Sequence, residues 1–190
     1  MYPNYVQDFR NNRFKFVTVN KILHDYDTVL YADSSVYMLR NIKQGVLTDL
    51  FDSMKTTFSD IGIRILTSSS HTNYPVTHPN LYSFFKVTVQ EMKDTTQLQA
   101  GVFLINNSPA GLNVMRRMIS CSLEPNCMAP EGAQVKCPYP GFTKNDAIVC
   151  HRFDQSALNM LMLELYGTDQ TKYYNKTTML HIKRFEECTI

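Results

Sequence analysis

The sequence has no apolar run that approaches the roughly 20 residues a helix needs to span a bilayer. It has no block of positive charge either, because its 19 Lys and Arg residues are scattered among 17 Asp and Glu, for a net charge of +2. Internal repeats and low-complexity linkers are also missing. We therefore expect no nucleic-acid partner, no transmembrane segment and a single domain over residues 1–190.

Paired C-x2-C motifs, which are typical of structural zinc sites, are missing too. Four of the five cysteines instead fall within one stretch rich in Pro and Gly, namely Cys121, Cys127, Cys137 and Cys150. This clustering favours disulfides that staple a long loop in an oxidising compartment over a zinc site or buried free thiols. Two glycosylation sequons, 106–108 and 175–177, fit such a compartment.

Hydrophobic periodicity predicts short strands that alternate with helices. Strands are expected at 28–32, 61–67, 101–105 and 179–182, and helices around 14–23, 47–54, 109–123 and 154–167. The continuous apolar run 101–105 indicates a central strand that is covered on both faces. Ser108 and Asp154 stand at helix N-cap positions, and 68–80 is expected to be a long surface loop.

This alternation predicts an α/β sandwich with a largely parallel sheet. In such sheets ligands bind at the carboxyl ends of the strands. Asp33 and Asn106 each follow a predicted strand, so we expect both side chains at one edge of the sheet.

Three segments carry polar side chains in patterns that suit a ligand. In 30–36, Asp33 and Ser35 could face a divalent cation that holds a diphosphate, or Asp33 could cap the next turn. In 98–106, Gly101 allows either a close approach of a ligand to the backbone or only a packing contact.

The third segment, 150–159, places a histidine, an arginine, a carboxylate and an amide ahead of an amphipathic helix. Asp154 as a simple N-cap and Arg152 as a solvated cation are the structural alternatives. A thiol nucleophile at Cys150 is disfavoured, because a catalytic Cys and His normally meet across a fold. Other potential ligands are His71, His78 and His181, although a lone histidine is more often structural.

Taken in order, the three segments resemble glycogenin-like glycosyltransferases, in which a strand ends in D-x-D, a later strand reads N-A-G-V and a helix opens with D-Q. A group of poorly characterised animal proteins, many of them from nematodes, is more similar still. The segments that carry this resemblance are Phe14-Lys15, Asp33-Ser34-Ser35, Thr77-His78-Pro79 and the string C-H-R-F-D-Q-S-A at 150–157.

The resemblance implies a GT-A fold, a three-layer α/β/α sandwich, and transfer of a sugar from a UDP-sugar to a glycan, protein or lipid acceptor in the Golgi lumen. It implies a Mn or Mg ion held by Asp33, Ser35 and His181. It places Asp154 and Gln155 in the catalytic site and His78 on the acceptor side. The residues it assigns to the donor are Asp33, Ser35, Ala100, Gly101, Asn106 and Arg152.

Two departures from the family pattern leave an alternative open. Ser35 stands where the family has a second Asp, which removes one anionic ligand from a cation that prefers charged oxygen. Only 13 residues precede the F-K segment, so we expect the first strands of the domain to be missing. The alternative is an inactive module of the same fold that binds a carbohydrate or a partner.

Overall fold

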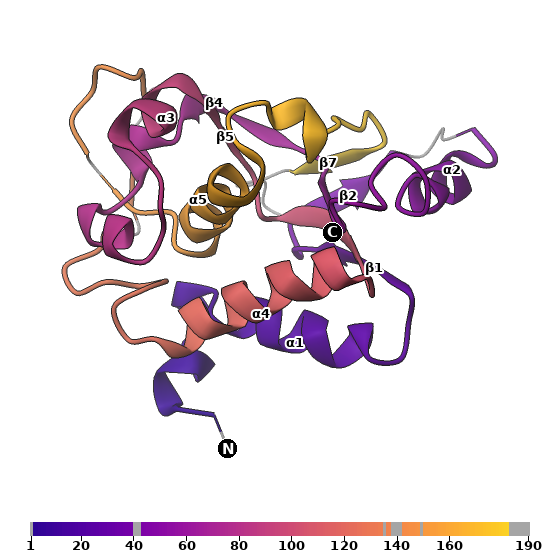
Figure 1. Ribbon diagram of the computed structural model, residues 1–190, viewed down its shortest axis with the longest axis horizontal. Coiled ribbons are helices and arrows are strands. Elements are labelled where there is room, and N and C mark those ends of the chain that lie inside the picture. Colours follow the sequence, from indigo (N-terminus) through magenta and orange to yellow (C-terminus); the bar gives the residue numbers. More distant parts are fainter. Residues whose placement is uncertain (1, 40–42, 135, 138–141, 149, 183–190) are drawn as a thin grey trace, which may run out of the picture.

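The protein is a mixed α/β protein, as the sequence predicts. The computed structural model describes residues 2–39, 43–134, 136–137, 142–148 and 150–182. Its helices are α1 (Phe14–Leu23), α2 (Val46–Asp52), α3 (Val89–Asp94), α4 (Pro109–Leu123) and α5 (Asp154–Tyr166) (Figure 1). Its strands are β1 (Thr28–Ala32), β2 (Val36–Met38), β3 (Ile63–Ile65), β4 (Ser68–Thr72), β5 (Thr96–Leu98), β6 (Val102–Asn106) and β7 (Leu180–Ile182).

The main sheet has the order β1-β6-β3, so the apolar run after Gly101 forms the central strand, as expected. The expectation of a mainly parallel sheet is wrong, because β6 is antiparallel to both of its neighbours. Two smaller antiparallel pairs join β2 to β7 and β4 to β5. The apolar content of a strand reports its burial on both faces but not its direction, which explains the error.

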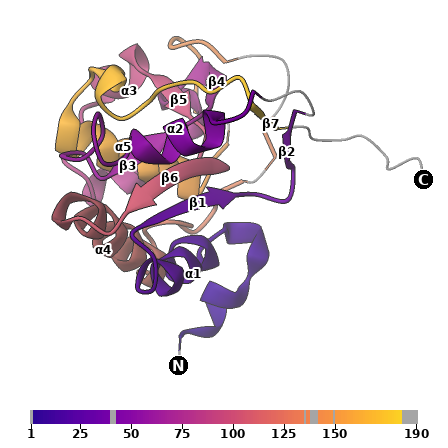
Figure 2. The same ribbon diagram turned by 90° about the vertical axis from the view of Figure 1, so that its right-hand side faces the viewer.

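Alternate residues of β6 face opposite layers of the fold. Phe103 and Ile105 belong to the larger apolar cluster, which also contains buried residues of α1, α4 and α5. Val102 and Leu104 belong to a second cluster with α2 and β7. The sheet is therefore covered on both faces, with α1 and α4 on one side and α2 on the other (Figure 2).

Helix α4 has the predicted bounds, and its start shows why. The Ser108 hydroxyl accepts a hydrogen bond from the Gly111 backbone N–H (3.1 Å), and Pro109 occupies the first helical turn. Gly111 packs against Gly62, where a Cβ would lie 2.1 Å from the Gly111 nitrogen. These two glycines let the helix start lie directly against the loop that enters β3.

Arg13 fixes the start of α1 against the carboxyl end of α4. It is 2% exposed, and its guanidinium donates to the backbone carbonyls of Ser122, Glu124, Pro125 and Ala129. Carbonyls at a helix end lack partners within the helix, so this side chain satisfies groups that burial would otherwise leave unpaired. Lys15, two residues further on, is thereby held over the sheet.

Two local expectations need correction. The stretch 68–80 is not one surface loop, because it contains β4 and two short 3-10 turns, Tyr74–Val76 and Pro79–Ser83. The side chains of β4 are mostly serine and threonine, so the strand has no hydrophobic alternation, and the sequence therefore did not predict its pairing with β5. Asp154 is not an N-cap but the first residue of α5, because Phe153 precedes it with φ 44°.

The predicted disulfides are confirmed. Cys121 is bonded to Cys127, and Cys137 is bonded to Cys150. Of the two sequon asparagines, Asn106 donates its amide to the Met54 carbonyl (3.0 Å), whereas Asn175 is exposed. Every helix in the described residues is too short or too polar to cross a bilayer.

Candidate functional site

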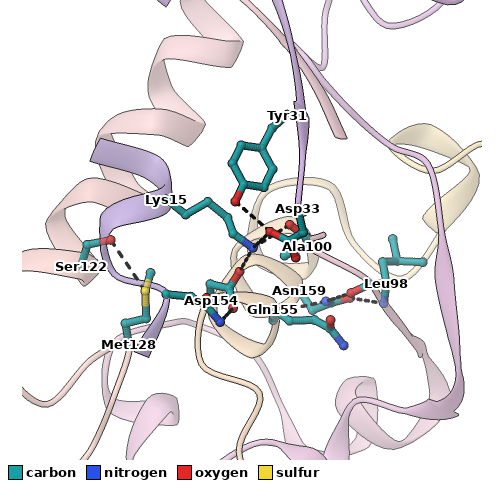
Figure 3. A network of polar contacts seen from close by, with 11 residues as sticks. Lys15, Tyr31, Asp33, Leu98, Ala100, Ser122, Met128, Asp154, Gln155 and Asn159 are labelled. Atoms are coloured by element: carbon teal, nitrogen blue, oxygen red, sulfur yellow. Dashed lines mark hydrogen bonds and ion pairs between the residues drawn. The ribbon is translucent and has the colours of Figure 1, made fainter. Parts of the chain in front are cut away.

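A buried lysine stands between two carboxylates at the centre of the site. Lys15 on α1 is 2% exposed, and its Nζ contacts the carboxylate of Asp154 and donates to the Ala100 carbonyl (3.0 Å). The same Nζ lies 3.3 Å from Oδ1 of Asp33. Figure 3 shows Lys15 reaching from one side, with Asp33 and Asp154 converging on its ammonium.

Asp154 uses both carboxylate oxygens. Oδ2 pairs with Lys15, and Oδ1 accepts from the Asn12 side-chain amide (3.1 Å). Burial raises the pKa of this carboxyl, and the Lys15 ammonium opposes that rise. Position at the start of α5 also favours a negative charge, because the free backbone N–H groups of a helix point there.

Asp33 follows β1 and is only partly exposed (28%). Its Oδ1 accepts from the Tyr31 hydroxyl (2.7 Å), and burial, with this hydrogen bond, raises the Tyr31 pKa. The Lys15 ammonium lies 5.0 Å from the centre of the Tyr31 ring. The cation therefore has a π-face on one side and carboxylates on the other.

Gly101 is required beside Asp33 for a steric reason. Its carbonyl accepts from the Asp33 backbone N–H (2.8 Å), and a Cβ on it would lie 2.9 Å from Oδ2 of Asp33. A side chain at this position would push the carboxylate away from Lys15. Of the two alternatives for Gly101, the structure shows a packing contact, which is to the Asp33 side chain.

Side-chain amides on the first turns of α5 form hydrogen bonds with β5. Gln155 donates to the Gln97 side chain (2.6 Å), and Asn159 both accepts from the Leu98 N–H (2.9 Å) and donates to the Leu98 carbonyl (2.7 Å). All these atoms are buried, so the bonds are shielded from water. These hydrogen bonds fix the position of Asp154 relative to Lys15.

Three hollows surround this cluster. The central cavity, about 130 Å³, is lined by Arg10, Asn12, Lys15, Asp33, Gly101 and residues 151–155. Asp33 and Asp154 therefore face one cleft. On one side lies the aromatic hollow, about 600 Å³, which shares Asn12 and Asp33 with the central cavity and contains Phe9, Phe14, Tyr31 and Ser35.

On the other side of the central cavity lies a larger one, which we call the hydroxyl cavity. It measures about 530 Å³ and shares Arg152 and Gln155 with the central cavity. Its other lining residues are 67–71, Gln99, Phe142, 176–178, Leu180, His181 and Ile182. The central cavity thus shares two lining residues with each of the other two hollows.

Five predicted site residues do not line the central cavity, namely Ser35, which lines the aromatic hollow, Ala100, whose carbonyl accepts from Lys15, and Asn106, His78 and His181. Asn106 pairs with Thr28, at the opposite end of β1 from Asp33, because β1 and β6 are antiparallel. Asn106 and Asp33 therefore do not share an edge of the sheet. The His78 ring accepts from the Asn80 N–H (3.3 Å) and lines neither the central nor the hydroxyl cavity among the described residues. His181 lines the hydroxyl cavity.

The side chains do not fit a metal site built by the protein alone. Oδ1 of Asp33 already faces the Tyr31 hydroxyl and the Lys15 ammonium. His181 uses Nε2 in a contact with the Thr178 carbonyl (2.9 Å), and it and Asp33 line different cavities. Within the described ranges, no group of three or more His, Cys, Asp or Glu is arranged to hold a metal ion.

Sequence reasoning gave Lys15 no role of its own, although the structure places it at the centre. A signal was present, since a lysine between Phe14 and Phe16 on an apolar helix needs a buried partner. The partner Asp154 lies 139 positions away, and no local pattern could have identified it. Asn12 was missed for the same reason, because its partner Asp154 lies 142 positions away. Tyr31 lies only two positions before its partner Asp33, so its role did have a local signal.

Comparison with known proteins adds little to this geometry. No protein-family model matches the sequence, and no curated protein matches it. A crystal structure of mouse xyloside xylosyltransferase 1 in its apo form is similar to this chain with a TM-score of 0.42 and 14% sequence identity. The similar region covers 87% of this chain and 50% of that one.

Proposed function

We propose that this protein transfers a sugar from a nucleotide diphosphate donor, a UDP-sugar, to an acceptor hydroxyl. The observation that carries the proposal is that the central cavity, with Lys15, Asp33 and Asp154 in its lining, shares lining residues with each of the two other hollows. A donor, its reacting sugar and an acceptor need three adjoining spaces in this order. The string at 150–157 and the strand tip at Asp33 support the same reading through their resemblance to glycosyltransferases.

In this proposal the aromatic hollow receives the nucleotide. Phe9 is 72% exposed and stacks edge-on against Phe14 (4.9 Å between ring centres), so its face is available to a nucleobase. Asp33, at the junction with the central cavity, lies beside the ribose, whose hydroxyl groups can donate to its carboxylate. The transferred sugar then reaches Lys15 and Asp154, whose charges and hydrogen bonds suit a polyhydroxylated ligand.

The reaction makes a bond between the acceptor oxygen and the anomeric carbon. It breaks the bond from that carbon to the diphosphate, which leaves with the electron pair. The proton of the acceptor hydroxyl passes to the released diphosphate, since a terminal phosphate titrates near pH 6. The Lys15 ammonium stabilises the negative charge that develops on the leaving oxygen. No step is assigned to a metal ion.

Calorimetric titration with UDP, in the presence of Mn and in EDTA, tests the donor site. We expect binding that Asp33→Asn weakens at least about tenfold and that the matched exposed variant Asp25→Asn leaves unchanged. Release of UDP from UDP-sugars in the presence of glycan acceptors tests turnover. Absence of UDP binding at millimolar concentration under both conditions would overturn the proposal.

A second candidate function is carbohydrate binding without turnover. It is favoured by one observation, that both oxygens of Asp154, the predicted catalytic carboxylate, are already occupied by Lys15 and Asn12. The same two experiments separate the candidates. UDP binding with UDP release favours the enzyme, whereas saccharide binding with no UDP release favours the binding module.

A further inference from the structure

The charged residues that line the hydroxyl cavity are all positive. Arg152 and Lys176 contribute two cationic groups to its lining, and none of its described lining residues is Asp or Glu. Burial lowers the pKa of His71, so this ring is neutral at physiological pH and adds no charge. The two cations give the cavity a positive potential that attracts an anion.

Arg152 is held in place without a partner for its charge. Its backbone N–H donates to the Ser156 hydroxyl (3.2 Å) and to the Val76 carbonyl (3.2 Å), which fixes the start of the side chain. Its Nε is buried and has no hydrogen-bond partner in the described part of the chain. No carboxylate of the described residues pairs with this guanidinium. A ligand that offers an acceptor to this buried, unpaired donor would gain a favourable hydrogen bond.

The rest of the lining suits hydroxyl groups. Ser70 and Thr178 present hydroxyls and Gln99 presents an amide, and among the described residues these side chains have no hydrogen-bond partner. The Thr67 hydroxyl is buried and also unpaired there. Phe142, which meets His71 edge-on, provides an apolar face of the sort that packs on a sugar ring. The volume of about 530 Å³ is that of a small-molecule site.

We propose that the hydroxyl cavity binds an acidic sugar, a saccharide that carries a carboxylate, sulfate or phosphate group. The anionic group lies on Arg152, whose planar guanidinium matches two acceptor oxygens, and Lys176, which also lines the cavity, adds charge. The sugar hydroxyls meet the serine, threonine and glutamine side chains. That this ligand is also the acceptor of the transfer rests on the proposed function, but its binding does not.

Calorimetry with four ligands tests the inference on the intact chain. The ligands are an unsulfated disaccharide that contains a uronate, its sulfated counterpart, a neutral disaccharide and inorganic sulfate. We expect either acidic disaccharide to bind at least about tenfold tighter than the neutral one and than sulfate, because both the charge and the hydroxyls contribute. The ratio between the two acidic ligands identifies the preferred anion. Equal binding of neutral and acidic disaccharides, or of sulfate and the acidic ones, would overturn the inference.

Variants locate the binding. Arg152→Gln and Lys176→Gln are expected to weaken the acidic disaccharides about tenfold or more, whereas the exposed control Lys172→Gln leaves them unchanged. Lys176 does not line the central cavity, so Lys176→Gln should leave UDP binding as it is. If Lys176→Gln weakens UDP instead and the acidic disaccharides do not bind, the two cations serve the donor diphosphate and the inference fails. Acidic-disaccharide binding without UDP binding would leave this inference standing and overturn the proposed function.

Discussion

The ammonium of Lys15 on α1 contacts the carboxylate of Asp154 at the first residue of α5, 139 positions further along the chain. The side chains are only 2% and 5% exposed, so water stabilises neither charge. Each charge is therefore tolerated only because the other is present. The contact that builds the central cavity also decides whether α1 and α5 can pack over the sheet.

Removal of one partner should consequently be costly. Lys15→Met keeps the length of the side chain and leaves Asp154 buried without its cation, and we expect a loss of about 3–5 kcal/mol in the free energy of unfolding. Urea denaturation followed by circular dichroism measures it. Lys21→Met on the exposed face of α1 is the control, with an expected change within about 0.5 kcal/mol.

The double variant Lys15→Met with Asp154→Leu distinguishes the contribution of the ion pair to stability from that of side-chain packing. Because it removes both charges together, it should recover a large part of the stability that Lys15→Met loses. A double variant as unstable as the sum of the two single ones would show that the residues do not interact. The double variant should lose sugar transfer even if it folds well.

His151 should make stability depend on pH. Its Nδ1 accepts from the His78 N–H (3.1 Å), its Nε2 contacts the Met128 carbonyl (3.0 Å), and burial lowers its pKa from 6.5 to about 4. Between these values the unfolded chain binds a proton that the folded chain does not. The free energy of unfolding should therefore fall by about 3 kcal/mol as pH drops from 6.5 to 4. Denaturation of His151→Gln across the same range should lack this component of the slope.

Replacement of the Asn159 amide should destabilise the fold. Its oxygen accepts from the Leu98 N–H and its nitrogen donates to the Leu98 carbonyl, so it continues the edge of β5 as a strand residue would. Asn159→Asp turns the donor into an acceptor that faces a carbonyl in a buried site. We expect a loss of about 2–4 kcal/mol, which thermal denaturation can follow. A stability equal to that of the unchanged chain would refute this role.

The two disulfides should differ in their effect on function. They close loops with sequence separations of 6 and 13 residues, and each is expected to add about 2–3 kcal/mol by limiting the unfolded chain. Cys150 directly precedes His151 and Arg152, whereas Cys121 and Cys127 lie at the far end of α4. Serine replacement of Cys137 and Cys150 should therefore reduce acidic-sugar binding as well as stability. Replacement of Cys121 and Cys127 should reduce stability alone.

Local signals in the sequence were sufficient for most of the elements. Ser108 and Pro109 marked the start of α4, and the continuous apolar run after Gly101 marked the central strand. Strand direction could not be predicted, because it depends on how the chain returns to the sheet and not on the residues within a strand. The prediction that Asn106 lies at the same sheet edge as Asp33 was wrong for the same reason.

For the site, the sequence located Asp33 and Asp154 but not what joins them. Each carries a local mark, one at a strand tip and the other at a helix start. In the sequence Lys15 stands out only as part of the F-K segment and Asn12 does not stand out at all, and their contacts span 139 and 142 positions. Long-range pairing of this kind is set by packing, on which a single sequence carries no direct information.

The approach of Gly101 to Asp33 has a consequence for the evolution of the chain. The space that any larger side chain at 101 needs is taken by Oδ2 of Asp33, so Gly101 cannot change freely while Asp33 stays. In an alignment of homologous sequences the two positions should therefore covary. Lineages that have replaced Gly101 should also have replaced Asp33, and with it the junction between the aromatic hollow and the central cavity. Such a lineage would have kept the fold but lost the nucleotide site proposed for that junction.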